Sequence, residues 1–213
     1  MSDTQDISIT SLFPVAIGRT NINRPISNSE SACFDDVAKN IVQNTFNTRS
    51  GNFYVLELSE LENLKKIIND SVVKYATAVF NVVPTATFKI TQSWMNYSVA
   101  NQQHHMHSHP NSFISGVFYP QAQSNIDKIT FRHKTHSSPF FINSLGNTFY
   151  SATSHSVGVS TGDIVLFPSW LEHYVPPLPN NYVGTRTSLA FNVFPENEMG
   201  TDYMLNCLKI KFD

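Results

Sequence analysis

A run of histidines in the middle of the chain has the side chains and the spacing of a metal site. Four of the eight histidines in the 213 residues lie within the six-residue run "HHMHSH". Alternate side chains of an extended strand point to the same face, so His107 and His109 are expected to direct two imidazoles at one ion. His105 shares their parity and His104 does not. Because Pro110 then turns the chain, the site is predicted to lie at an accessible strand end.

The second half of the chain supplies residues that complete such a site. His173 follows the bend "FPSW", and Arg186 and Ser188 open the run "RTSLAFNVF". A third imidazole from a neighbouring strand would give a facial set of three ligands, which leaves further metal positions open. The guanidinium of Arg186 offers a fork of donors that suits a carboxylate. The residues after it are apolar on both faces, which favours a central strand over a solvated edge.

The elements that position these residues are expected to be two helices followed by strands. Helical spacing of apolar residues predicts a helix over 31–46 capped by Ser31, and a second helix from Ser59, where "SELE" fits a capping box. Both helices would cover the back of a sheet. After Pro84, short β-rich runs between turn residues are typical of an all-β barrel or sandwich. Strands are predicted near 87–97, 113–120, 127–133, 154–159, 163–168, 172–176 and 184–194.

Composition and charge limit the partners. With 14 basic and 16 acidic residues the formal charge is −2, so no basic face for nucleic acid or a membrane is expected, and a small or neutral ligand is favoured. Cys33 and Cys207 form neither a disulfide framework nor a metal knuckle, which suits a reducing cytoplasm. The N-terminus lacks the pattern of a signal peptide, and no apolar run reaches the length of a membrane span.

Several segments together resemble a known family, the 2-oxoglutarate and Fe(II)-dependent oxygenases, and within it an oxygenase subgroup of bacteria and their phages. The similar segments are "LFPVAI", "SWMNY", "HSHPNSFISGVFY", "GDIVLFPSWLEHYVPP" and "RTSLAFNVF", in this order. The resemblance covers nearly the whole chain. It implies a mainly β fold with N-terminal helices: a double-stranded β-helix, or cupin-like jelly roll, backed by two helices.

The resemblance implies one domain over 1–213, with helical support at 31–80, a β-helix core at 87–194 and a C-terminal tail at 195–213. It also implies Fe(II) and 2-oxoglutarate as cofactors and molecular oxygen as a substrate. The activity would be decarboxylation of 2-oxoglutarate to succinate coupled to hydroxylation of a small molecule or protein side chain. The compartment would be the cytoplasm, or the host cytoplasm for a phage protein. The long loop 134–153 is expected to act as a lid.

The resemblance also assigns roles to single residues. His107 matches the first metal ligand, His173 the distal histidine, and Arg186 the basic residue that holds the far carboxylate of 2-oxoglutarate, with Ser188 as a hydroxyl helper. By strand parity from His107, Val117 and Tyr119 would face the cosubstrate. Asn96 or Tyr97 would add a further polar contact.

One position departs from the family pattern. The family has Asp or Glu two residues after the first histidine, and this chain has His109, with no acidic residue from Ser71 through Ile126. The third ligand is therefore His109 or a distant carboxylate, of which Asp127, Asp163 and Glu172 are the nearest in sequence. Three neutral imidazoles are favoured. They would leave the ion its full charge, and they make Zn²⁺ an alternative metal.

Two other functions stay open from the sequence. A three-histidine cupin-type metalloenzyme would keep the metal and not use 2-oxoglutarate. A jelly-roll module used for binding or structure would need no metal, and its histidines would be surface residues. Loss of 2-oxoglutarate affinity on Arg186→Ala would separate the oxygenase from the first of these alternatives, and stoichiometric metal would exclude the second.

Overall fold

The computed structural model describes residues 7–133, 143, 145–146 and 148–212. Most of the strands belong to two antiparallel sheets that face each other. The large sheet has the order β1-β9-β6-β11-β4-β3-β2, and the small sheet has the order β5-β10-β7-β8. From β4 to β11 successive strands alternate between the sheets, except that β7 and β8 are neighbours in the small sheet, and this jelly-roll order confirms the predicted fold class. The bounds of the large sheet are β1 (Gly18–Asn21), β2 (Ile41–Gln43), β3 (Thr48–Ser50), β4 (Thr87–Ser98), β6 (Ile114–Gln121), β9 (Asp163–Pro168) and β11 (Arg186–Met199). Those of the small sheet are β5 (His104–His107), β7 (Lys128–Arg132), β8 (Ser154–Gly158) and β10 (Glu172–Val175).

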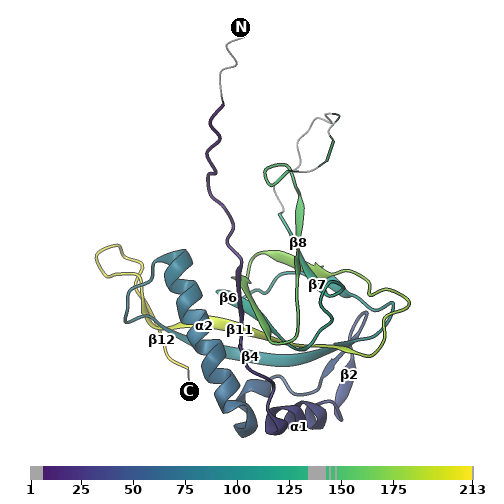
Figure 1. The fold of residues 1–213 in the computed structure, drawn as a ribbon. Coiled ribbons are helices and arrows are strands. Elements are labelled where there is room, and N and C mark those ends of the chain that lie inside the picture. The colour runs from purple at the N-terminus through teal and green to yellow at the C-terminus, as the bar shows by residue number, and fades with distance from the viewer. Residues whose placement is uncertain (1–6, 134–142, 144, 147, 213) are drawn as a thin grey trace.

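Two apolar cores lie on the two faces of the large sheet. The first packs the helices α1 (Asn28–Val37) and α2 (Glu62–Phe80) against the sheet and contains Leu64, Ile68, Phe118 and Phe191. The second lies between the sheets and contains Val117, Tyr119, Ile129, Phe131 and Phe167. In Figure 1 the β7–β8 ladder rises on the side of β4 opposite to α1. Residues that point inward from the large sheet and from the small sheet therefore share the space between the two sheets.

The first predicted helix is wrong in its second half and in its cap. Helix α1 ends at Val37, and Ile41–Gln43 and Thr48–Ser50 form a hairpin that adds to the edge of β4. Ser27, not Ser31, caps α1 in a capping box with Glu30. The apolar residues beyond Val37 kept a helical spacing, but β-branched Ile41 and Val42 pair readily in an edge ladder.

The second predicted helix is correct in position, and its capping box is wrong. Ser59–Leu61 form a 3₁₀ turn (η2) that continues into α2, whose start has no side-chain cap. A preceding 3₁₀ turn, η1, spans Val55–Glu57. The apolar stripe of α2 is buried against the large sheet as expected. Among the described residues, none of the helices is long and apolar enough to cross a membrane.

Part of the predicted C-terminal tail, 195–213, is paired in strands. Strand β11 continues to Met199, past the predicted end at 194, and pairs there with β12 (Leu208–Ile210). From Thr187 to Val193, β11 lies between β4 and β6. Arg186, at its beginning, is thus on a central strand of the large sheet, as the apolar residues after it indicated.

Candidate active site

Two of the predicted ligands lie opposite each other on neighbouring strands. In the antiparallel pair of β5 and β10, His107 is the register partner of His173. His109 lies beyond the end of β5, where its backbone N–H donates to the Ser169 carbonyl at 2.9 Å. One nitrogen from each of the three rings lies within 4.8 Å of the others, as a single metal ion requires. The structure thus brings His107, His109 and His173 together from two separate parts of the chain.

Hydrogen bonds fix which ring nitrogens are left for a metal. His107 Nδ1 lies 2.8 Å from the His105 carbonyl oxygen, and His173 Nδ1 lies 3.0 Å from the Leu171 carbonyl oxygen. A carbonyl can only accept, so both Nδ1 atoms carry the proton and both Nε2 atoms keep a free lone pair. His109 Nε2 lies 3.3 Å from His173 Nε2. Such carbonyl contacts orient imidazole ligands in metal sites.

Burial keeps these imidazoles neutral. Desolvation lowers the pKa of His107, lowers that of His109 to about 4 and lowers that of His173 to about 2, with the neighbouring rings adding a smaller effect. A neutral imidazole is the form that binds a metal. The donor set therefore fits a divalent ion at neutral pH without first losing protons.

Arg186 brings a positive charge into the same cavity and has unused donors. The residue is 3% exposed, and its Nε and Nη1 atoms are buried with no hydrogen-bond partner. A buried charged donor without an acceptor is costly, so a site of this kind is built for an anion that arrives from outside. The cavity that Arg186 lines contains about 450 Å³ of empty space, part of it open to solvent, and is also lined by the three histidines.

Other predicted contact residues surround Arg186. Ser188 is the register partner of Asn96 across β11 and β4, and both line the cavity, as do Val117 and Tyr119. The Asn96 Oδ1 atom is buried and has no partner. Burial raises the pKa of the Tyr119 phenol to about 12, so this side chain stays a neutral hydroxyl. Strand parity from the histidine strand was therefore sufficient to place both residues of β6 in the cavity.

Tyr97 is the exception among these predicted contacts. It follows Asn96 on β4, so its side chain points to the opposite face of the sheet and packs against the helix-side core. Between the two residues offered for this contact, only Asn96 reaches the cavity.

His104 lines the cavity as well, although strand parity predicted that it points away from His107. The pairing of β5 with β10 shifts between His173↔His107 and Val175↔His104, so three residues of β5 advance against two of β10. Such a bulge re-aims side chains. The rings of His104 and His105 consequently stack with centroids 4.9 Å apart. Desolvation lowers the pKa of His104 to about 3, and the Arg186 charge contributes to the shift.

Trp94 is a further cavity residue, outside the predicted set of site residues. It contributes to the lining, and its ring lies 5.8 Å from that of His109. The strand alternation Trp94, Asn96 was visible in the sequence and is the signal that places both on one face.

The distant carboxylates have other partners. Asp163 accepts hydrogen bonds from Arg19 and Asn21, and Asp127 accepts from the Tyr182 hydroxyl and the Gln123 backbone. Glu172 precedes His173 on β10 and is not part of the cavity lining. Within the described part of the chain, the groups of residues able to hold a metal contain histidines only. Most of the predicted lid, residues 134–142, 144 and 147 of the loop 134–153, lies outside the described residues.

A jelly roll with facing histidines and a buried arginine in one cavity is the arrangement that the resemblance to the 2-oxoglutarate and Fe(II)-dependent oxygenases implies. Residues 92–192 match the family model described as "Putative 2OG-Fe(II) oxygenase", which confirms the resemblance to the 2-oxoglutarate and Fe(II)-dependent oxygenases, a class of oxidoreductases. The match covers the strands that carry the histidines, Arg186 and Ser188. No curated protein matches the chain.

Solved structures show the same fold at low sequence identity. A 2OG-Fe(II) oxygenase family oxidoreductase from Burkholderia pseudomallei is 13% identical, with a TM-score of 0.54 over 83% of this chain and 84% of that one. HygX from Streptomyces hygroscopicus, with nickel and 2-oxoglutarate bound, is 12% identical, with a TM-score of 0.55 over 84% and 82%. A prolyl-4-hydroxylase from Pseudomonas putida is 12% identical, with a TM-score of 0.53 over 84% and 92%.

Proposed function

We propose that this protein is a non-haem Fe(II)- and 2-oxoglutarate-dependent dioxygenase that hydroxylates a C–H bond of a small molecule or a protein side chain. The observation that carries the proposal is the buried Arg186, whose Nε and Nη1 atoms have no partner, in the same cavity as three neutral imidazoles. One part of the cavity suits a metal and another suits a carboxylate. 2-Oxoglutarate has a 2-oxo acid end that can chelate a metal and a second carboxylate that Arg186 can hold, so it fits both parts.

The chain's own residues would divide the work of binding. His107, His109 and His173 would hold the metal through their Nε2 atoms, in the orientation set by the carbonyls of His105 and Leu171. Arg186 would hold the far carboxylate of 2-oxoglutarate, and Ser188, Asn96 and Tyr119 would contribute polar contacts around it. Bound Fe(II) would supply oxygen activation coupled to decarboxylation of 2-oxoglutarate to succinate. Val117 would form part of the apolar wall that keeps water from the cosubstrate.

The charge of the site favours an anionic chelator. Three neutral imidazoles leave a divalent ion its full charge, and Arg186 adds one positive charge. Among the described residues, those that line this cavity include no carboxylate. A dianion such as 2-oxoglutarate would offset most of this charge. The same ligand set also suits Zn²⁺, so a zinc enzyme that does not use 2-oxoglutarate is the second candidate. The observation that favours it is the histidine at position 109, where the family pattern has a carboxylate.

The decisive experiment is an anaerobic titration of the Fe(II)-loaded protein with 2-oxoglutarate, followed by the visible charge-transfer band of the chelate. The wild type is expected to show the band, and Arg186→Ala to bind iron but to lose the band at the same 2-oxoglutarate concentration. Arg186→Lys should recover only part of the affinity, because an ammonium lacks the planar fork of donors. Arg49→Ala is the matched control, since Arg49 lies on β3, outside the cavity lining, and contacts the Ser50 carbonyl and the Phe53 ring.

Each result distinguishes the two candidates. A band that is absent from the wild type, although iron binds, would overturn the use of 2-oxoglutarate and leave the zinc or cofactor-independent enzyme. Equal 2-oxoglutarate affinity in the wild type and Arg186→Ala would remove the role proposed for Arg186. We also keep the reducing cytoplasm as the proposed compartment, because Cys33 and Cys207 are both free thiols.

A further inference from the structure

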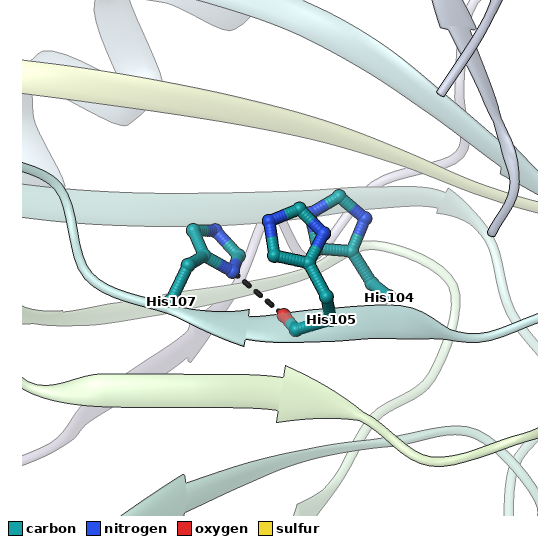
Figure 2. A group of neighbouring side chains, drawn as sticks. All are labelled: His104, His105 and His107. Atoms are coloured by element: carbon teal, nitrogen blue, oxygen red, sulfur yellow. Dashed lines mark hydrogen bonds between the residues drawn. The ribbon is translucent and has the colours of Figure 1, made fainter. Parts of the chain in front are cut away.

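Strand β5 carries a second group of three histidines, two of which the proposed active site does not use. Figure 2 shows that the rings of His104, His105 and His107 lie on the same side of the strand, although His104 and His105 are neighbours in the chain. One ring nitrogen from each lies within 4.8 Å of the others. Ring centroids of each pair are 4.8 to 4.9 Å apart. His104 and His105 have no part in the proposed iron site.

The bulge in β5 is the reason that this group exists. In a regular strand His104 and His105 would point to opposite faces. The register shift against β10 turns both rings to the side of His107. Burial differs within the group, since His104 is partly enclosed in the cavity and His105 is exposed. An ion could therefore reach the group from solvent through His105.

The two groups share one ligand, and that ligand can serve only one ion at a time. His107 Nδ1 donates to the His105 carbonyl, so only His107 Nε2 has a free lone pair. An ion bound to His107, His109 and His173 occupies that lone pair. An ion bound to His104, His105 and His107 would need it as well.

We propose that His104, His105 and His107 form an outer metal site for Zn²⁺ or a similar borderline divalent cation, and that filling it excludes an ion from the deep site of His107, His109 and His173. Three imidazoles and one water are a normal tetrahedral set for zinc. The outer ion would remove a ligand from the deep site and place a second positive charge beside Arg186. An outer ion and a deep ion would therefore compete for His107, and the protein would hold one or the other.

The deep site is expected to bind more tightly than the outer one. Two of its ligands are oriented by backbone carbonyls, whereas His105 is exposed and has more rotamers to lose. The Arg186 charge also lies close enough to lower the pKa of His104, so it would repel an ion bound there. The wild type should therefore bind one equivalent of metal tightly, at the deep site.

Co²⁺ is the probe, because its visible absorption reports both the number of bound ions and their coordination. The metal-free protein and its variants are titrated with Co²⁺ without 2-oxoglutarate, and affinity for Zn²⁺ is measured by displacement. His109→Ala removes the deep site and should still bind one equivalent with a tetrahedral spectrum. His105→Ala/His109→Ala should bind at least about tenfold more weakly. His155→Ala/His109→Ala is the matched control, because His155 is exposed on β8 and belongs to neither group.

A second pair of variants protects the test against misfolding. His173→Ala removes the deep site from β10, and adding His105→Ala should weaken its remaining Co²⁺ binding in the same way. The proposal is overturned if folded His109→Ala and His173→Ala bind no Co²⁺, or if His105→Ala has no effect in either background. Two equally tight equivalents in the wild type would overturn the exclusion of one ion by the other. These outcomes do not depend on 2-oxoglutarate, so they are separate from the test of the proposed function.

Discussion

The Nε2 atoms of His109 and His173 lie 3.3 Å apart, although 64 positions separate the two residues in the chain. Neither ring would be close to the other without the β5–β10 ladder and the backbone hydrogen bond from His109 to Ser169. The third ligand of the deep site thus depends on the loop after β5, which is hydrogen-bonded to the connection between β9 and β10. Predictions about this ligand test both its chemistry and its support.

The first prediction concerns the identity of the third ligand. His109→Asp restores the carboxylate of the family pattern and adds one negative charge beside the metal. We expect the variant to retain Fe(II) and to bind 2-oxoglutarate about tenfold more weakly, since one charge at this range is worth about 1–2 kcal/mol. The chelate band measures the affinity. Loss of iron, or tighter binding of 2-oxoglutarate than in the wild type, would contradict this account of the charge.

The second prediction concerns the support of His109. Ser169 is 0% exposed, and its hydroxyl bonds those of Ser112 and Ser115, each at 2.8 Å, while its carbonyl accepts from His109. Ser169→Ala should lower the free energy of unfolding by about 1–3 kcal/mol. It should also weaken metal binding, because the loop that carries His109 loses the hydrogen bond between the Ser112 and Ser169 hydroxyls and keeps only the backbone bond from His109 to the Ser169 carbonyl. Ser124→Ala, at an exposed serine pair, is the control and should change neither quantity.

The third prediction concerns the packing of the large sheet on its helix-side face. A Cβ added at Gly116 on β6 would overlap the Phe191 ring and lie 2.8 Å from Leu166 Cδ2. Overpacking of a rigid core costs about 1–3 kcal/mol, so Gly116→Ala should lower the unfolding midpoint in denaturant. Gly158→Ala is the control, because nothing lies within 4 Å of the added methyl group. Equal stability of the two variants would mean that the Phe191 ring moves aside freely.

The fourth prediction concerns pH. Glu30 is 2% exposed and accepts from both terminal nitrogens of Arg24 and from the Ser27 backbone, and the Arg24 hydrogen bonds hold its pKa below the usual value of 4.5. A lowered pKa gives stability that is present above pH 4.5 and is lost as pH falls through the folded-state value.

Glu30→Gln should therefore destabilise the protein at pH 7, by about 1.5–3 kcal/mol, and the difference from the wild type should shrink below pH 4.5. Urea unfolding at pH 7, 5 and 3 measures it. Asp36→Asn, in an exposed ion pair with Lys39, should have little effect at any pH. A difference that stays constant from pH 7 to pH 3 would show that the Glu30 carboxylate does not titrate with folding.

Much of the fold followed from local patterns. Strand β4 and the strands from β6 to β11 were predictable because short apolar runs alternate with turn residues, and α2 was predictable from its apolar stripe. The hairpin of β2 and β3 was not, because Ile41, Val42 and Phe46 keep a helical spacing and only the neighbouring edge of β4 makes a strand preferable. A tertiary contact of this kind has no local signal.

The site shows the same division. Parity predicted that Val117 and Tyr119 face the cosubstrate, and the family resemblance pointed to Arg186 and Ser188; all four line the cavity. Parity failed for His104, because it assumes a regular strand and the extra residue in β5 is visible only when the pairing with β10 is known. The choice between Asn96 and Tyr97 likewise needed the face of β4 that turns toward the small sheet.

The position of β5 at the edge of the small sheet gives the metal a mechanical role. Within the described part of the chain, β10 is the only strand that β5 pairs with. An ion held by His107 and His173 would add a bond across this ladder that does not depend on backbone pairing. Metal loading should thus slow amide hydrogen exchange in β5 more than in β6, which is held on both sides. The bound ion would therefore help to keep β5 paired with β10 at the edge of the small sheet.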